Sequence, residues 1–570
     1  MTNLKQMLRS PMFIVIAIVL TWFIATFLIM PNLNLLGTVF FPEGSFSPRA
    51  IEKLLSSERA MRSLLNSFLL AVALSITVNS VGIFIVLVTR YFDIKGARFL
   101  WLGYATTLIY GGVVLVAGYK FIYGSNGFIT RSLLKIFPGL EPTWFSGMFA
   151  VVFVMTFATT GNHMLFLTNA LAKVDYQTVE AAQQMGASTW TILRRIVIPT
   201  LKPTLYAVSI LTFLGGLGAL ASPLILGGRD FQTITPMILT FANTQSSRDL
   251  AATLALILGG ATMLLLLVLN RLEKGGTYFS VSKVPVALVK QKIHNPVANV
   301  VVHIIAYALF VIYIIPPTLI LLFSFTDAAT ISSGNLTWSS FTLANYQLVF
   351  TDAAALHPFL VSVAYSAVSS IVVIVGILFV ARLITRYKNK ITELIEYLLH
   401  IPWILPTSMI ALGLMMTFDR AQPLVGYQVL TGTLIILAIG YIISKIPFTL
   451  RMMKAAFTGI NQNLEEAASM LGAGQFYTFR RVLFPLVAPA AAAITALNFN
   501  SKLDDYDTSV FLAHPFFQPL GIFIKNATDG ETMGDSTALT FVYTVILMLI
   551  TGTTLWLVYG GGTKVLTRRR

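Results

Sequence analysis

Two segments of the chain repeat one pattern of acidic, small, aromatic and basic residues. The first runs from Glu180 to Pro203 and the second from Glu466 to Pro489, and 9 of their 24 positions are identical without a gap. Each segment carries Glu-Ala-Ala, a glycine, an aromatic residue, an Arg-Arg pair and a proline, in this order. Carboxylate and guanidinium groups can orient a partner through charge-assisted hydrogen bonds, and an aromatic side chain can fill a pocket. The pattern therefore indicates two docking sites for another protein.

A glycine in each copy allows a sharp reversal of the chain. Gly186 and Gly472 can adopt backbone angles at which a Cβ would clash. A second short helix should end near Pro199 or Pro485, because proline cannot continue a helix interior. Each copy is therefore predicted to be a helix–turn–helix on the cytoplasmic face. The residues predicted to contact the partner are Glu180, Ala181, Ala182, Gly186, Trp190, Arg194, Arg195 and Pro199 in the first copy, and Glu466, Ala467, Ala468, Gly472, Phe476, Arg480, Arg481 and Pro485 in the second.

A second group of polar residues lies late in an apolar segment, where residues 498–507 read NFNSKLDDYD. A charge at the centre of a bilayer costs about 2.5–3.5 kcal/mol on insertion scales, so such residues usually line a cavity or form pairs. The corresponding stretch of the first half, 215–219, carries no charge, which predicts a chemically one-sided pathway. Alternatively, the span ends near Phe499 and these residues form an ordinary outside loop. The pathway candidates are Asn498, Asn500, Lys502, Asp504 and Asp505.

Several kinds of chemistry find no support in the sequence. The phosphate-binding pattern G-x-x-x-x-G-K-[ST] does not occur, so ATP would have to bind to another chain. The chain has no cysteine, which excludes disulfides and iron–sulfur clusters, and the histidines show no metal-ligand spacing. No segment outside the apolar spans is long enough to capture a solute by itself. We therefore expect no enzymatic activity and no cofactor or metal in this chain.

The composition places these groups in a membrane. Of the 570 residues, 56% are hydrophobic and only 11% are charged, against roughly 25% charged in soluble domains. The net charge of +16 could suit a nucleic-acid partner, but the basic residues stand between apolar spans, so no nucleic acid is expected. A span needs about 20 apolar residues. Twelve candidate spans lie near 12–30, 64–88, 99–119, 145–169, 203–226, 250–270, 299–324, 358–381, 396–417, 428–449, 487–511 and 537–560.

The order of these spans suggests two homologous halves of six helices. Residues 1–275 form the first predicted transmembrane half, 276–297 a basic cytoplasmic linker, and 298–570 the second transmembrane half. Basic residues alternate between the segments that flank the spans, which predicts that both termini are cytoplasmic. The glycines at 111–112 in the third span and the prolines at 402 and 406 in the ninth can interrupt their helices, and interrupted helices often border a transport site. Alternatively, these residues are simple packing kinks.

The two repeated loops resemble the EAA loop of ABC importer permeases, in which Glu-Ala-Ala, three residues, glycine and nine residues precede Ile-x-Leu-Pro. Here the last element reads Ile-Val-Ile-Pro at 196–199 and Val-Leu-Phe-Pro at 482–485, so the leucine is replaced in both. The resemblance implies that each loop is a coupling helix that seats in a groove of an ATPase subunit. It also implies two copies of that ATPase, which would bind ATP and Mg, together with an extracytoplasmic solute-binding protein. The expected location is the bacterial cytoplasmic (inner) membrane, in contact with the lipid bilayer.

The sequence leaves the transported solute open. Two fused halves resemble the ferric-iron permeases, whereas related systems handle phosphonate, thiamine, polyamine or sugar phosphate. Asp504, Asp505 and Asp507 would suit a cation, but Lys502 opposes that interpretation. An ion-coupled secondary transporter would need ionisable groups in mid-membrane, and the paired loops would then lack a purpose. A membrane-embedded enzyme would need a catalytic cluster within the spans, and we find none.

Overall fold

The computed structural model describes residues 11–274 except 43, residues 289–529 except 335 and 462, and residues 535–559. Within these ranges the regular elements are helices, and the only β pairing consists of isolated bridges. Ten described helices are long and apolar enough to cross a membrane, and two bent helix pairs raise the number to twelve if each pair is one span. The predicted all-α polytopic fold is therefore confirmed.

The first half follows the predicted order of spans. Short helices, among them α4 (Arg49–Ser56), α8 (Phe128–Ile136), α13 (Ala221–Leu226) and α14 (Ile234–Ala242), lie between the long ones. Its spans are α2 (Pro11–Phe23) continuing through the π-helix η1 (Ile24–Ile29) into α3 (Met30–Phe40), then α5 (Glu58–Val86), the pair α6 (Ala97–Tyr104) and α7 (Gly112–Tyr123), α9 (Gly147–Leu171), α12 (Ile198–Leu217) and α15 (Arg248–Lys274).

The second half repeats this order. Its spans are α16 (Pro296–Ser324), α19 (Ala353–Arg386), the pair α20 (Lys390–Ile404) and α21 (Thr407–Phe418), α22 (Leu434–Thr458), α25 (Phe484–Leu503) and α28 (Asp535–Tyr559). Its short helices include α17 (Ala328–Ser333), α18 (Ala344–Thr351), α26 (Ser509–Leu512) and α27 (Leu520–Ala527). The helices α12 and α25 begin and end at positions 286 residues apart, which is the spacing of the repeated loops.

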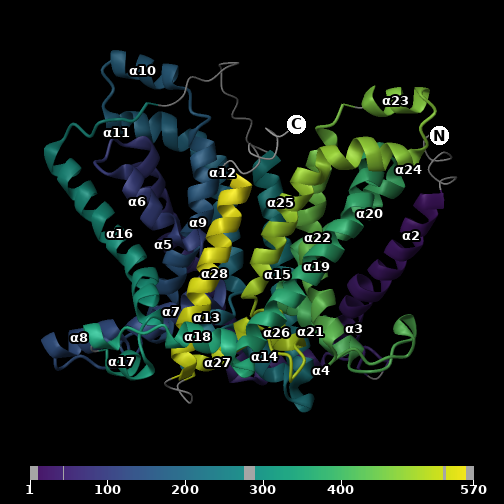
Figure 1. Cartoon of the computed structure of the whole chain (residues 1–570), viewed down its shortest axis with the longest axis horizontal. Helices are drawn as coiled ribbons and strands as arrows, with labels where there is room; N and C mark the ends of the chain where they lie inside the picture. The colour runs from purple at the N-terminus through teal and green to yellow at the C-terminus, as the bar shows by residue number, and fades with distance from the viewer. Residues whose placement is uncertain are drawn as a thin grey trace.

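The first span of each half packs against the other half. Helix α3 lies along α21, and α16 lies along α6 and α7 (Figure 1). Gly103 permits the second contact, because a Cβ at this position would lie 2.2 Å from a ring carbon of Phe310. The Tyr104 hydroxyl donates to the Ala306 carbonyl over 2.7 Å across the same contact. The two halves are therefore interlocked rather than merely adjacent.

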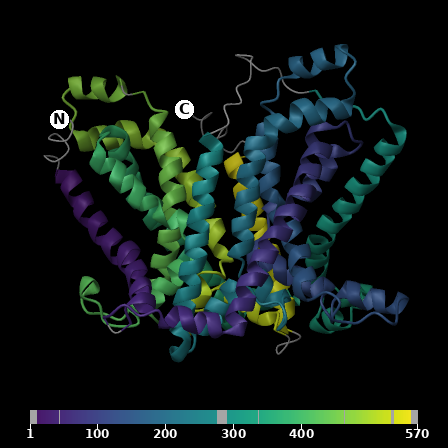
Figure 2. The same ribbon diagram turned by 180° about the vertical axis from the view of Figure 1, so that it is seen from behind.

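The helices converge at one end of the molecule and spread apart at the other. Figures 1 and 2 show the repeated loops, α10 (Tyr176–Gln184) and α23 (Asn463–Met470), on the side where α2 begins and α28 ends. Helices α2 and α16 diverge from each other toward that side. At the opposite end α7 packs against α13 and α27, and α21 packs against α26. One of these contacts, between α7 and α27, joins the two halves at the end remote from the loops.

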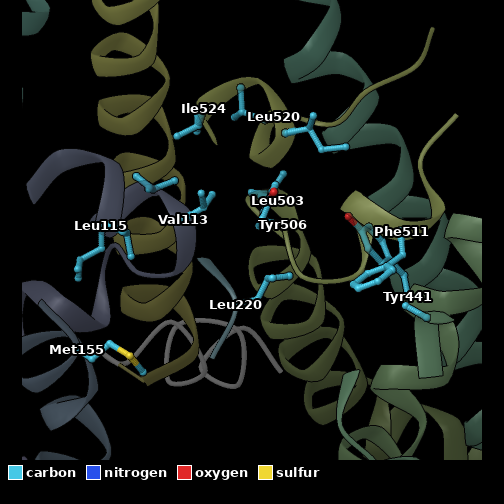
Figure 3. Close-up of a cluster of buried hydrophobic side chains, with 14 of the residues drawn as sticks. Val113, Leu115, Met155, Leu220, Tyr441, Leu503, Tyr506, Phe511, Leu520 and Ile524 are labelled. Atoms are coloured by element: carbon cyan, nitrogen blue, oxygen red, sulfur yellow. The ribbon is translucent and has the colours of Figure 1, made fainter. Parts of the chain in front are cut away.

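A buried apolar cluster joins the halves at the convergent end. Figure 3 shows side chains from α7 and α9 of the first half near side chains from α22, α25, α26 and α27 of the second. Close helix packing elsewhere depends on glycine. A Cβ on Gly216 of α12 would lie 2.8 Å from the backbone Cα of Ala71 in α5, whereas a Cβ on the neighbouring Gly215 would meet no atom within 4 Å.

We predict that Gly216→Ala destabilises the protein by about 1–3 kcal/mol, because overpacking forces two helix backbones apart. Gly215→Ala is the matched control and should leave stability unchanged or slightly raised, since alanine favours helix over glycine. Thermal unfolding of the purified chain in detergent, followed by tryptophan fluorescence, measures both. Equal unfolding temperatures for the two variants would contradict the close α5–α12 contact.

Candidate functional site

Both repeated loops form the predicted helix–turn–helix, and their turns are alike in detail. In the first loop α10 is followed by α11 (Thr189–Ile192), and in the second α23 is followed by α24 (Gln475–Thr478). Gly186 and Gly472 have φ of 80° and 78°, the left-handed conformation that only glycine adopts readily. In each turn the amide after the glycine donates over 3.0 Å to the carbonyl five residues back. This pattern is the Schellman motif, which satisfies the last carbonyls of a helix.

The path after each turn differs from the prediction. The Arg pairs lie in π-helical segments, η4 (Leu193–Val197) and η8 (Phe479–Leu483), which run directly into α12 and α25. The expectation that a second short helix ends near Pro199 and Pro485 is therefore wrong. Each proline directly follows the π-helical segment and lies in the first turn of the following span. The loop is thus continuous with the membrane-spanning helix behind it.

Most of the residues predicted to contact a partner are accessible. The Trp190 and Phe476 side chains are each 65% exposed, and apolar Met185 and Leu471 beside the turns are 81% and 88% exposed. Exposed apolar groups of this kind mark interaction surfaces. The exposed positions are Glu180, Ala181, Gly186, Trp190, Arg194, Arg195, Glu466, Ala467, Gly472, Phe476, Arg480 and Arg481; Pro199, Ala468 and Pro485 are half-buried, and Ala182 is buried.

The first loop is held by apolar packing and by the segment that precedes α16. Val179 and Ala182 of α10 are buried in an apolar cluster with the ends of α5 and α9. Gln291 is 5% exposed; its amide donates to the Tyr91 carbonyl over 2.8 Å, and its carbonyl accepts from the Asp93 amide over 2.9 Å. Its side chain accepts a hydrogen bond from Gln183 of α10.

No sequence pattern distinguishes Gln291 from the rest of the predicted linker. Of that predicted linker, residues 276–288 lie outside the described residues. The part that follows them, from residue 289, forms a bridge with Phe92 and contacts the first loop. The connection between the halves is therefore also a support for one docking surface.

The second loop is held by charge. Glu465 occupies the position that Val179 holds in the first loop, and it accepts a hydrogen bond from Arg382 of α19. The Arg382 and Glu465 side chains are 12% and 19% exposed, and Arg386 lies 3.9 Å from the same carboxylate. The aligned repeat shows valine at 179 and glutamate at 465. This difference is the sequence signal that points to the ion pair between Glu465 and Arg382.

A cavity of about 670 Å³ lies between the halves, and two interrupted helices border it. The segments Ala97–Leu108 and Gly112–Ile136 meet at 110°, and α20 and α21 meet at 102°. The interruptions predicted at Gly111–Gly112 and at Pro406 are therefore confirmed, whereas Pro402 lies inside α20. Gly112 has φ of 55°, and a Cβ there would lie 3.0 Å from the Asp504 carboxylate. Two further helix ends, Leu217 of α12 and Leu503 of α25, lie beside the cavity.

The structure separates the predicted pathway residues into two groups. The span α25 continues past Phe499 to Leu503, so residues 498–503 are helical and not an outside loop. Asp504 and Asp505 line the cavity, as does Asp507.

The other three pathway residues do not line this cavity. Asn498 is buried and donates to the Thr449 hydroxyl over 2.9 Å, and Asn500 lines a separate, smaller cavity. Lys502 is 5% exposed, and its ammonium group lies 2.8 Å from the Asp505 carboxylate and 4.7 Å from the centre of the Tyr441 ring. The described lining of the large cavity contains three carboxylates and no basic side chain.

Helical spans, an interlocked pair of halves, a cavity between them and two accessible loops on one side define a multi-pass membrane transport protein. Residues 373–560 match the family model described as the binding-protein-dependent transport system inner membrane component. A Sinorhizobium fredii protein described as a probable ABC transporter permease is 41% identical over 93% of this chain and 93% of its own length. The chain therefore belongs to the ABC transporter permeases of import systems.

Other relatives carry the names of specific solutes. A ferric transport system permease protein of Actinobacillus pleuropneumoniae is 21% identical over 96% of this chain and 78% of its own length. A sulfate transport system permease protein of Salmonella typhimurium is 29% identical over 31% of this chain and 65% of its own length. Among solved structures, a bacterial ABC transporter involved in alginate import matches 45% of this chain and 93% of its own, with 19% identity and a TM-score of 0.38.

We predict that Glu465→Val destabilises the permease by about 1–3 kcal/mol, because it leaves Arg382 charged and largely buried without its partner; the partial exposure of the pair reduces the usual cost. The double variant Arg382→Met with Glu465→Val should recover most of the loss. Glu466→Gln, at the neighbouring exposed position, is the control and should not change the unfolding temperature. A double variant as unstable as Glu465→Val alone would show that the pair does not hold the second loop.

Proposed function

We propose that this permease translocates ferric iron, delivered by an extracytoplasmic binding protein, across the bacterial cytoplasmic (inner) membrane. The observation that carries the proposal is the extent of the similarity. Relatives named for ferric transport match over 92–96% of this chain and therefore over both halves. Relatives named for 2-aminoethylphosphonate transport match over 45% of it, and the sulfate relative matches over 31%.

The energy for transport would come from two copies of a separate ATPase subunit that binds ATP and Mg. Each copy would seat one of the two loops, whose exposed aromatic, glutamate and arginine residues suit a groove with apolar and charged walls. In this proposal the chain itself is not an enzyme and holds no cofactor. The start of α2 and the end of α28 lie on the side of the loops (Figure 1), which supports cytoplasmic termini. The division into halves at 1–275 and 298–570, joined by 276–297, remains part of the proposal.

The mechanism that these features support is alternating access. Because each loop continues without a break into α12 or α25, a displacement of the loop is transmitted to a helix that ends beside the cavity. Closure of two ATPase copies on ATP would draw the loops together and open the opposite end to the binding protein. Hydrolysis would then reset the halves. The same machinery could carry phosphonate, thiamine, polyamine or sugar phosphate, and the experiment below discriminates among these solutes.

We predict that Glu180→Lys together with Glu466→Lys lowers uptake by at least about tenfold, since charge reversal at both docking surfaces opposes orientation of the ATPase. Both residues are exposed, so the variant should remain in the membrane at normal yield. Uptake of labelled ferric iron by cells that express the complete system is the measurement, with Glu58→Lys at an exposed site on the other side as the control. Normal uptake by the double variant would refute the role of the loops.

Purification in mild detergent tests the remaining partners and the solute. Two ATPase copies for each permease, and a binding protein that carries iron, are the expected result. A binding protein that carries one of the other solutes would correct the substrate and keep the class. Uptake by the purified chain alone in liposomes, driven by an ion gradient, would instead indicate a secondary transporter.

A further inference from the structure

We infer that the cavity between the halves is a passage for cations, in which the Asp504 and Asp507 carboxylates face the cargo and the unpartnered hydroxyls of Thr235 and Ser408 lie in the wall. The inference rests on the proposed function only in that the cavity belongs to an importer. It identifies the chemical class of the cargo from this chain's own residues, independently of the names of its relatives.

The first argument is the charge of the lining. Its described residues include Asp504, Asp505 and Asp507 and no lysine, arginine or histidine. All three carboxylates belong to the second half. The repeat-related wall of the first half carries Gly218 and Ala219 where the second half carries the first two aspartates. Because a cavity between apolar helices screens charge poorly, its carboxylates attract cations more strongly than they would in water.

The second argument concerns the lysine that could have cancelled this charge. Lys502 is buried and does not line the cavity; its ammonium group pairs with Asp505 and lies over the Tyr441 ring. Asp505 also accepts a hydrogen bond from the Thr508 amide over 3.1 Å. Asp504 and Asp507, by contrast, have no ion pair or side-chain hydrogen bond with another described residue. Two acidic side chains of the cavity wall therefore have no basic partner among the described residues.

The third argument comes from two hydroxyl groups that carry no charge. Thr235 of α14 is 1% exposed and Ser408 of α21 is 4% exposed, and both line the cavity. Neither hydroxyl oxygen has a hydrogen-bond partner in the described structure. Buried hydroxyls normally find a partner, and their oxygen atoms can coordinate a hard cation or accept from an ammonium group. Thr235 belongs to the first half and Ser408 to the second, so each wall of the cavity contains one buried hydroxyl without a partner.

The same residues argue for passage rather than tight binding. No group of three histidine, aspartate or glutamate side chains among the described residues is arranged to hold one metal ion. A site that binds too tightly would not release its cargo, whereas isolated carboxylates attract a cation without chelating it. The chemistry common to ferric iron and to an organic cation such as a polyamine is positive charge. An anionic cargo would meet two unpaired carboxylates.

The natural absence of cysteine permits a direct test. Ser501 lines the cavity one helical turn before Asp504 and is exposed. We expect Ser501→Cys in membrane vesicles to react at least about tenfold faster with a cationic than with an anionic methanethiosulfonate reagent of similar size, because the carboxylates concentrate cations. The rates are normalised to Ser339→Cys, which replaces an exposed residue of the short 3-10 helix η6 (Trp338–Ser340). Thr159→Cys, on the wall of the first half, is a second cavity position at which the two reaction rates are compared.

When Asp504→Asn and Asp507→Asn are added, the ratio of the cationic to the anionic reaction rate should fall to the ratio measured at the reference position. Adding Gly218→Asp to this variant should restore the higher ratio, because Gly218 faces the cavity. The substitution fits there, since Gly218 has a negative φ and a Cβ at this position would meet nothing closer than 3.5 Å. The control variant Asp419→Asn, on the outer surface, should leave the ratio of the two reaction rates unchanged. If an aspartate on the opposite wall restores the ratio, the two native aspartates act through their charge and not only through a structural role. Gel filtration checks that each variant is correctly folded.

Equal rates for the two reagents at both cavity positions, or faster reaction of the anionic reagent, would overturn the inference. Protection of Ser501→Cys by lanthanum chloride, a hard tripositive metal ion, assigns a metal cargo, and protection by spermidine assigns an organic cation. Protection by sulfate alone would also overturn it. These measurements need neither ATPase nor binding protein, so the proposed function can fail while the cation preference stands, and the reverse also holds.

Discussion

A polypeptide in lipid must satisfy its own backbone hydrogen bonds, because the hydrocarbon offers no water to do so. Long uninterrupted helices meet this requirement, and most of the chain consists of them. The helical backbone is interrupted at four places beside the central cavity. They are Gly111–Gly112, Leu405–Pro406, and the ends of helices at Leu217 and Leu503. Irregular backbone is tolerated at membrane depth only where it is buried in protein or lines a cavity. The position of the cavity therefore explains where the helices are interrupted.

The repeat shows which properties the two halves share and which they do not. Both loops have the same left-handed glycine, the same Schellman hydrogen bonds and the same continuation through a π-helix into a span. Their attachments differ, since Val179 is buried among apolar side chains whereas Glu465 pairs with Arg382. The geometry presented to a partner is thus repeated, while each half supports it with its own interior. The segment around Gln291, which precedes α16 of the second half, adds a further support to the first loop.

The cavity is asymmetric for a related reason. Gly216 of the first half allows α12 to approach the backbone of α5, while the repeat-related Lys502 fills space between α25 and α22 and neutralises Asp505. The same position of the repeat is therefore used for close helix packing in the first half and for charge compensation in the second. The consequence is that glycine and apolar residues face carboxylates across the cavity.

The sequence by itself determined the class of fold, the approximate spans, the internal repeat, the glycine turns of the loops and the two interrupted helices. Each of these depends on residues close together in the chain, such as a run of apolar side chains or a glycine before a helix. Only the tertiary structure decided that the first span of each half packs on the other half, that Gln291 supports the first loop, and that Pro199 and Pro485 begin a span rather than end a helix. It also decided that Lys502 turns away from the cavity while Asp504 and Asp507 face it. These features depend on contacts between distant segments and on the direction of individual side chains, which local pattern and composition do not specify.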